Sequence, residues 1–212
     1  MDDSYARWKS QPIHYEIHLT VKTTSINKFV EDCNELGVKP IVLALQFKDG
    51  SGSMQDVMTS SKVTGSDEDA FKHMEEISLS LSKKGYFVVR KKIETVPWHS
   101  KALVHGEDSK EGYFEAHAKI KLVSDCGKSH LKSTLDSFEF HLSKNARAVD
   151  DSGGEIFMAT LRKKDVSYDL FDGELRTKLS FFQMYGIEVV NKPVVEYALY
   201  DSNVAHDVAW TG

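Results

Sequence analysis

One alternating eight-residue pattern occurs twice in this chain, about one hundred residues apart. The copies are His14–Val21 (HYEIHLTV) and Tyr113–Ile120 (YFEAHAKI). Each alternates apolar with polar residues, and each places a His two residues after a Glu. Strict alternation is typical of a β-strand with one apolar face and one polar face. The two halves are therefore expected to contain equivalent strands that present the same Glu-x-His pair.

Other residues recur at nearly the same separation, which indicates an internal duplication. The matched pairs are Glu16 with Glu115 (offset 99), Thr59 with Thr160 and Gly85 with Gly186 (both 101), and Glu94 with Glu196 (102). Each half also predicts the element order β-α-β-β-α-β, the ferredoxin-like unit. The predicted strands are 13–22, 39–47, 54–63, 86–96, 112–123, 139–145, 156–163 and 187–200, and the predicted helices are 24–36, 66–84, 128–137 and 174–185.

The predicted fold class is α+β: two tandem ferredoxin-like units, with antiparallel sheets and helices on the outer faces. The chain of 212 residues has room for two such units of about 100 residues each. The predicted division is an N-terminal segment 1–11, a first repeat 12–97, a connector 98–111, a second repeat 112–201 and a C-terminal tail 202–212.

Composition narrows the classes of partner. The net charge of −5 disfavours a general nucleic-acid or membrane binder, leaving at most a nucleotide or short oligonucleotide. Cys33 and Cys126 are too far apart for a zinc knuckle, and an apolar leader and a membrane-length apolar run are both absent from the sequence. The expectation is a soluble, cytoplasmic protein. Homo-oligomerisation is compatible with it, because ferredoxin-like sheets often pair between chains.

In a ferredoxin-like unit both helices cover one face of the sheet, so the polar face of each strand should be the open one. The expected open face in the first half is Glu16, His18, Thr20, Thr59, Ser61, Arg90, Lys92 and Glu94. In the second half it is Glu115, His117, Lys119, His141, Ser143, Asn145, Thr160, Arg162 and Glu196. Such alternation also suits a solvated face. If the two faces meet, the charges need pairing, a ligand or a metal.

The first interpretation of this set is a metal site. Glu and His two residues apart on a strand point the same way. Two carboxylates and two imidazoles from Glu16, His18, Glu115 and His117 would suit a divalent metal such as Zn or Mn.

The second interpretation is acid–base catalysis on a phosphoester. His18-Leu19-Thr20-Val21 and His141-Leu142-Ser143 resemble the His-x-Thr/Ser signature of the 2H phosphoesterases, the RNA 2′,5′-ligase and cyclic phosphodiesterase family. That family has two duplicated lobes with one motif in each. The resemblance implies that one His acts as base, the other as acid, and that the hydroxyls hold the phosphate of a nucleotide or other small phosphorylated molecule. Here His18 is on the first strand of its half and His141 on the second strand of its half. The candidate catalytic residues are His18, His117 and His141.

The third interpretation is non-catalytic binding of a small anionic ligand, for which Arg90, Lys92, Lys119 and Arg162 supply charge-assisted donors. The candidate ligand-binding residues are Thr20, Thr59, Ser61, Lys92, Glu94, Lys119, Ser143, Asn145, Arg162 and Glu196.

Overall fold

A computed structural model of the chain describes residues 12–46, 53–102, 112–123, 127–145 and 155–207. The predicted N-terminal segment and most of the predicted connector lie outside these residues. The first half contains β1 (Ile13–Lys22), α2 (Ile26–Glu35), β2 (Lys39–Gln46), β3 (Ser53–Gly65), α3 (Asp67–Lys83) and β4 (Phe87–Thr95). After the short helix η1 (Ser100–Ala102), the second half contains β5 (Tyr113–Leu122), α4 (Gly127–Ser137), β6 (Phe140–Asn145), β7 (Phe157–Lys164), α5 (Tyr168–Phe182), η2 (Gln183–Tyr185), β8 (Ile187–Val189), β9 (Val194–Asp201) and η3 (Val204–Asp207).

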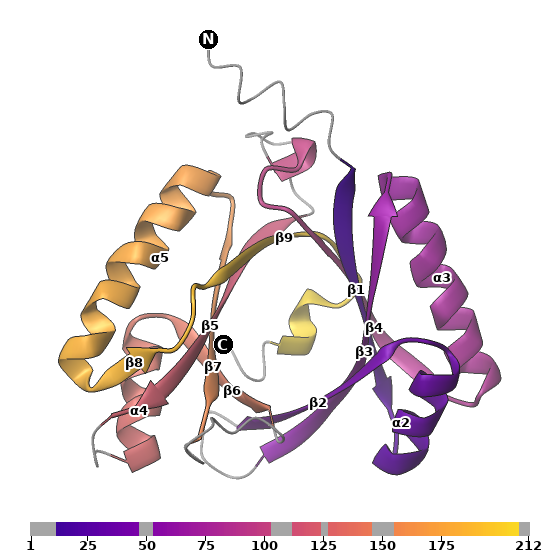
Figure 1. The fold of residues 1–212 in the computed structure, drawn as a ribbon, viewed down its shortest axis with the longest axis horizontal. Helices are drawn as coiled ribbons and strands as arrows, with labels where there is room; N and C mark the ends of the chain where they lie inside the picture. The colour runs from indigo at the N-terminus through magenta and orange to yellow at the C-terminus, as the bar shows by residue number, and fades with distance from the viewer. Residues whose placement is uncertain (1–11, 47–52, 103–111, 124–126, 146–154, 208–212) are drawn as a thin grey trace.

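The two halves repeat one strand order, and their edges join. The first half runs β4-β1-β3-β2 and the second β9-β5-β7-β6, with every pairing antiparallel. β4 pairs with β9, and β2 pairs with β6. Each of these eight strands therefore has a hydrogen-bonded neighbour on both sides, and the sheet closes into a barrel (Figure 1).

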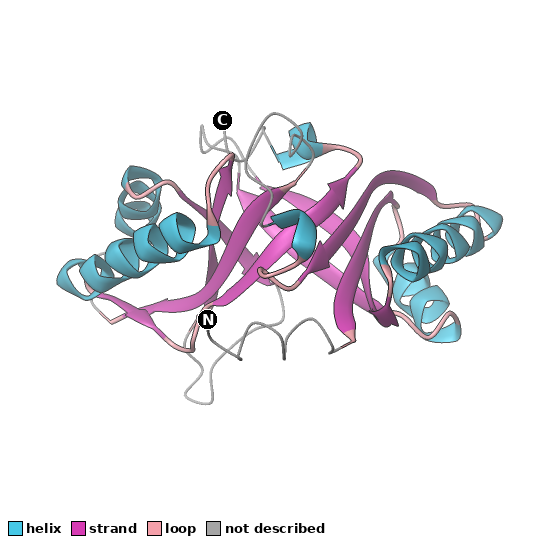
Figure 2. Ribbon diagram, turned by 90° about the horizontal axis from the view of Figure 1, so that it is seen from above, coloured by secondary structure: helices cyan, strands magenta, loops and turns pink. Residues whose placement is uncertain are grey.

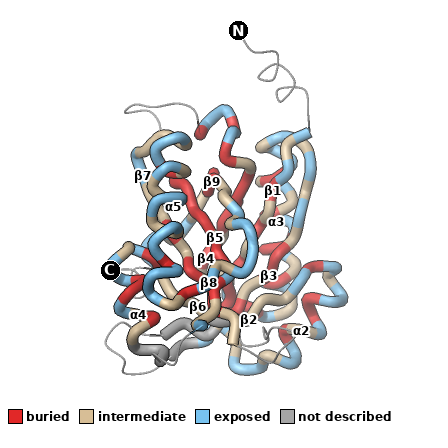
Figure 3. Tube along the Cα trace, turned by 60° about the vertical axis from the view of Figure 1, so that its left-hand side comes forward, coloured by how far each residue is buried: buried red, intermediate tan, exposed pale blue. Residues whose placement is uncertain are grey.

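The helices lie outside the barrel, α2 and α3 against the first half and α4 and α5 against the second (Figure 2). The apolar residues of each strand point toward them: Tyr15, Ile17 and Leu19 of β1 are buried, as are Phe114 and Ala116 of β5. Burial is concentrated along the strands, while the outer faces of the helices are exposed (Figure 3). The predicted α+β fold, with two tandem ferredoxin-like units and helices outside, is confirmed.

Local sequence signals explain several boundaries. The Ser66 hydroxyl accepts a hydrogen bond from the Asp69 backbone N–H, and the Asp69 carboxylate accepts one from the Ser66 N–H, which is a capping box at the start of α3. Gly85 and Gly186 end equivalent helical segments with positive φ (88° and 68°). The last predicted strand, 187–200, is two strands, β8 and β9, and Pro193 lies between them.

The closure of the barrel was not predicted from the sequence, which indicated two separate antiparallel sheets. The two sheets are one, because the outer strands of each half pair with those of the other. The polar faces of both halves consequently point into one interior. This places the two Glu-x-His pairs in a common space.

Candidate functional site

The barrel encloses a cavity of about 760 Å³. Its polar lining comes from both halves, because successive residues of a strand alternate between the helices and the interior. β1 and β5 contribute their Glu-x-His pairs, and the neighbouring strands contribute further charged residues. The polar and charged lining residues are Glu16, His18, Thr20, Lys39, Asp56, Lys62, Arg90, Lys92, Glu94, Glu115, His117, Lys119, His141, Ser143, Thr160, Arg162 and Glu196.

Strand register shows that the interior holds the same five-residue arrangement twice. In the first half Glu16 lies opposite Lys62 on β3 and Glu94 on β4, and His18 lies opposite Ser60. In the second half Glu115 lies opposite Arg162 on β7 and Glu196 on β9, and His117 lies opposite Thr160. We call Glu16, His18, Ser60, Lys62 and Glu94 the first set, and Glu115, His117, Thr160, Arg162 and Glu196 the second set. Each set contains a Glu-x-His pair, a hydroxyl, a cation and a further Glu.

In the first set the His18 ring lies between two hydrogen-bond acceptors. Its Nε2 is 3.0 Å from Glu94 Oε2, and its Nδ1 is 3.2 Å from the Thr59 carbonyl oxygen. A carbonyl and a carboxylate can only accept hydrogen bonds, so both ring nitrogens must carry protons. Burial works against the charged ring, but the hydrogen bond and charge of Glu94 outweigh it and raise the pKa of His18. Both contacts of the His18 ring therefore favour its protonated form.

In the second set the His117 ring has different partners. Its Nδ1 is 3.0 Å from the Thr160 hydroxyl, which can donate or accept, and its Nε2 is 3.9 Å from Glu196 Oε2. Burial, followed by the charges of Glu94 and Glu16, raises the pKa of Glu196 to about 7. The second set therefore contains a histidine that contacts a hydroxyl rather than a carbonyl, and a carboxyl that gains or loses its proton near neutrality.

Lys92 distinguishes the two sets. It lies opposite His18, and Val194 takes the equivalent place opposite His117. The buried Lys92 ammonium is 2.5 Å from Glu94 Oε1 and also contacts Glu115 Oε2, so it joins the two halves. Burial would raise the pKa of Glu94, but Lys92 and then His18 outweigh it and lower that pKa to about 2. The two equivalent glutamates therefore differ in the direction of their pKa shift: the pKa of Glu94 is lowered and that of Glu196 is raised.

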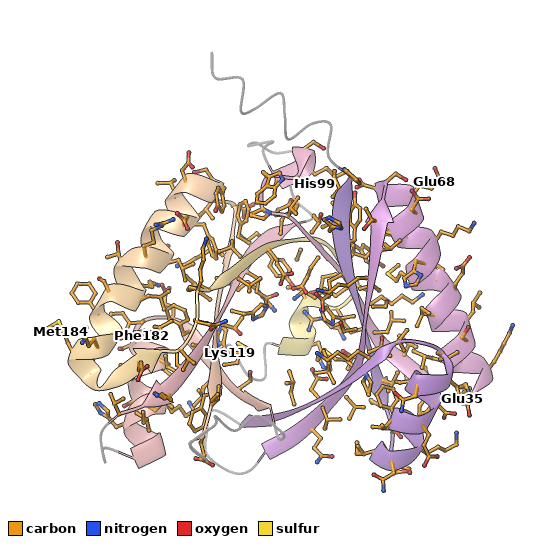
Figure 4. All side chains as sticks on the ribbon, viewed as in Figure 1. Glu35, Glu68, His99, Lys119, Phe182 and Met184 are labelled. Atoms are coloured by element: carbon orange, nitrogen blue, oxygen red, sulfur yellow. The ribbon has the colours of Figure 1, made fainter. Side chains whose placement is uncertain are left out.

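The arginines of the cavity have carboxylate partners. Arg90 donates from Nε and Nη2 to Asp201 (2.9 and 2.6 Å), which also accepts from the Tyr113 hydroxyl at 2.7 Å. Arg162 Nη2 donates to Glu115 at 2.8 Å. Lys119 differs, because within the described residues its ammonium has no carboxylate partner although it lines the cavity. Lys119 is labelled in Figure 4.

The C-terminal helix η3 adds a contact to the cavity wall. His206 Nε2 lies 3.2 Å from Oδ1 of Asp56, a buried cavity-lining residue of β3. Figure 1 shows η3 inside the outline of the ring. The predicted tail 202–212 thus begins with a segment that packs against the barrel, and 208–212 lie outside the described residues.

The predicted polar face is largely the cavity wall, with one error. Thr59 lies opposite Leu19 and Ser61 opposite Ile17, so both face the helices, and Ser61 Oγ is 3.0 Å from His73 of α3. Their assignment to the open face is wrong. The true equivalents are Ser60 with Thr160 and Lys62 with Arg162, at an offset of 100, whereas the prediction matched Thr59 with Thr160. A slip of one residue moves a strand's side chains to the other face.

Because of the same slip, the prediction missed two residues of β3 that contact Glu16. Ser60 donates to Glu16 at 2.6 Å, and Lys62 lies 3.3 Å from the other oxygen of that carboxylate. His141 and Ser143 of β6 line the cavity, with His141 opposite Thr160. Asn145 lies opposite Leu43 in the β2–β6 pairing, and its side chain lies outside the described part of the chain.

The predicted metal ligands are brought to one cavity, but in a different grouping. Ligand atoms of Glu94, Glu115 and His117 lie within 4.8 Å of one another. Two carboxylates and an imidazole fit the ligand preferences of Zn or Mn. The Lys92 ammonium already contacts both carboxylates, however, so a divalent cation here would have to displace it. Glu16 and His18 are linked to this group through the contact of His18 with Glu94.

None of the helices in the described ranges is both long enough and apolar enough to cross a bilayer.

Comparison with known proteins yields no family-model match and no match among curated proteins. Solved structures with some similarity include the acetolactate synthase small subunit of Thermotoga maritima, with 11% identity, a TM-score of 0.29, and coverage of 86% of this chain and 92% of that one. A structure described as a candidate chlorite dismutase has 11% identity, a TM-score of 0.28, and coverage of 93% and 98%. These similarities are too low to indicate a function.

Proposed function

We propose that the barrel cavity binds a small phosphoester and hydrolyses it by general acid–base catalysis, with His117 and Glu196 as the proton-transferring pair. The proposal retains the phosphoester chemistry suggested by the His-x-Thr/Ser tripeptides and moves its centre from His18 to the second set. Its main support is one observation: two equivalent His–Glu contacts face one cavity, His18 with Glu94 and His117 with Glu196. Lys92 lies opposite His18 and forms an ion pair with Glu94, whereas Val194 takes the equivalent place opposite His117.

The charge of the lining favours an anionic substrate. Six lysine or arginine side chains and five carboxylates line the cavity of a chain whose overall net charge is −5. The protonated His18 adds a further positive charge, and Glu196 in its neutral form removes a negative one. Lys119 is placed to receive the substrate, because it lies two residues after His117 on the same face of β5 and binding there breaks no existing ion pair among the described residues. Lys39 of β2 also lines the cavity without an ion pair in those residues, but it belongs to the other half.

His117 and Glu196 divide the proton transfers between them. His117 Nε2 accepts a proton from water as the water oxygen attacks phosphorus. The bond from phosphorus to the leaving oxygen breaks, and that oxygen takes the proton of the Glu196 carboxyl. The proton on His117 then returns to Glu196, directly or through water. Environments that push two carboxyl groups to different pKa values are characteristic of acid–base sites.

The other residues have supporting roles in this proposal. Thr160 orients the His117 ring through Nδ1, and His18 contributes fixed positive charge. His141 lies on the other side of Thr160 and faces the same cavity. It is the second candidate for contact with the substrate. Non-catalytic binding of an anion is the alternative, and it predicts affinity without turnover.

Hydrolysis of 2′,3′-cyclic nucleotides tests the proposal. His117→Gln and Glu196→Gln are each expected to reduce kcat by about 10²–10⁴-fold, the usual contribution of a positioned proton donor or acceptor. Activity should also fall as pH rises through about 7, because Glu196 donates only in its protonated form. Product formation by chromatography is the measurement.

The matched control is His14→Gln. His14 is exposed on the same strand as His18 and is not among the cavity-lining residues. Its replacement should leave kcat unchanged. Full activity in His117→Gln would contradict the assignment. Binding of the nucleotide without turnover by the unmodified chain would instead support the non-catalytic alternative.

A further inference from the structure

We infer that the ligand of this cavity is amphipathic: a phosphate head attached to an aliphatic or aromatic body, rather than inorganic phosphate or a polyphosphate chain. The inference deepens the proposed function, on which the phosphate identity of the head depends. It is carried by a group of accessible apolar side chains in a cavity whose ion pairs are concentrated where β4, β9 and β5 meet.

The charged side is the seam where β4, β9 and β5 meet. Lys92 of β4 contacts Glu94 and Glu115 there, and His117 of β5 approaches Glu196 of β9. Arg162 of the adjoining β7 reaches Glu115. An anionic head placed by Lys119 would lie beside the proton-transferring pair.

The apolar residues lie toward the opposite seam, where β2 joins β6, among a few charged ones such as Lys39 of β2 and Asp56 of β3. Ile41 and Leu43 of β2 line the cavity, with Ile41 opposite Met58 of β3. Met158 of β7 lies opposite Lys119 on one neighbour and Ser143 on the other. Met58 and Met158 are equivalent in the duplication, because Met58 lies opposite Thr20 and Met158 opposite Lys119. In the eight-strand ring this seam is four strands from the β4–β9 seam.

These four apolar side chains are only partly buried, although they point into the barrel. Apolar surface left accessible in a cavity gains free energy when an apolar group covers it. Methionine is suited to this because its flexible side chain adapts to varied shapes. A cavity of about 760 Å³ is large enough for a head and a body together, since small-molecule sites usually span about 300–1,000 Å³. Inorganic phosphate would leave the apolar wall uncovered.

Calorimetric titration of the full-length Glu196→Gln chain tests the inference without requiring turnover. The probes are inorganic phosphate, methyl phosphate, butyl phosphate and phenyl phosphate. Affinity is expected to rise by up to about fourfold per buried methylene, with phenyl phosphate among the tightest. Met158→Gln and Met58→Gln, each in the same background, should flatten this dependence and leave the affinity for inorganic phosphate unchanged.

The control is the same substitution at Met184, which is 78% exposed and lies outside the barrel (Figure 4). Met184→Gln should keep the full chain-length dependence. Met158→Leu should also keep it, which separates loss of apolar contact from loss of folding. An affinity independent of the organic group would overturn the inference, and so would a dependence that survives both Met→Gln changes in the cavity. Failure of every probe to bind would overturn it as well.

The inference and the proposed function fail separately. A chain-length dependence without any hydrolysis by the unmodified protein would remove the proposed catalysis and leave the amphipathic ligand. Hydrolysis of cyclic nucleotides without a chain-length dependence would leave the proposed catalysis and remove the amphipathic ligand.

Discussion

Replacing Glu196 with glutamine is expected to change the free energy of unfolding more favourably at pH 9 than at pH 4. The difference between the two effects should be on the order of 3 kcal/mol. Burial and the neighbouring Glu94 and Glu16 raise the pKa of Glu196 from its ordinary value of 4.5 to about 7. The folded state therefore binds a proton more tightly than the unfolded state does. The stability that this proton provides is complete below about pH 4.5 and is lost as pH rises through 7. Glutamine carries no charge at either pH and avoids the loss.

Urea denaturation of both proteins at pH 4 and pH 9 measures this difference. Glu188→Gln is the control, because Glu188 lies on β8 with an exposed side chain paired to Lys121. The control should change stability by less than about 1 kcal/mol at either pH. A Glu196→Gln effect of the same size at both pH values would show that Glu196 has an ordinary pKa in the folded protein.

Replacing Lys92 with methionine is expected to destabilise the protein by about 3–5 kcal/mol near pH 7, the usual cost of removing one partner from a buried ion pair. The Lys92 side chain is 9% exposed, and those of Glu94 and Glu115 are 3% exposed. Without the ammonium, His18 and Arg162 are the cationic partners that these two carboxylates retain within the described part of the chain. Adding Glu94→Gln and Glu115→Gln to the Lys92→Met chain should recover part of the lost stability, because the uncompensated charges are then removed.

The adjacent Lys91→Met is the matched control. Lys91 belongs to the same strand but points to the outer face, where it pairs with the exposed Glu75 at 2.8 Å. Its loss should cost less than about 1 kcal/mol. Equal effects of the two substitutions in thermal and urea denaturation would contradict the claim that the buried Lys92 stabilises the fold by pairing with Glu94 and Glu115.

The fold could be predicted from the sequence because its signals are local and occur twice. Alternation in 14–21 and 113–120 identifies the two central strands, and the capping residues around Ser66 mark a helix start. The closure of the barrel has no such signal. It depends on pairing between β4 and β9 and between β2 and β6, and these strands are remote in the chain. The sequence therefore predicted the units and not how they join.

The site could be predicted only in part, for a related reason. The Glu-x-His pairs were identified because they repeat at an offset of 99, whereas Thr59 and Ser61 were misassigned by one residue in β3. The sequence could have shown that Val194 is the equivalent of Lys92, because the two are separated by 102 residues, as are Glu94 and Glu196. Its meaning required the register that places both beside a histidine.

Carbon-13 NMR of carboxyl-labelled glutamate tests the central claim most directly, because Glu94 and Glu196 can be followed in one titration of one sample. Glu94→Gln and Glu196→Gln assign the two resonances. The expected result is that these equivalent residues titrate far apart, with the pKa of Glu196 near 7 and that of Glu94 near 2. Titration of both residues together, near the ordinary pKa of a glutamate, would contradict the asymmetry between the two sets and with it the proposed acid–base pair.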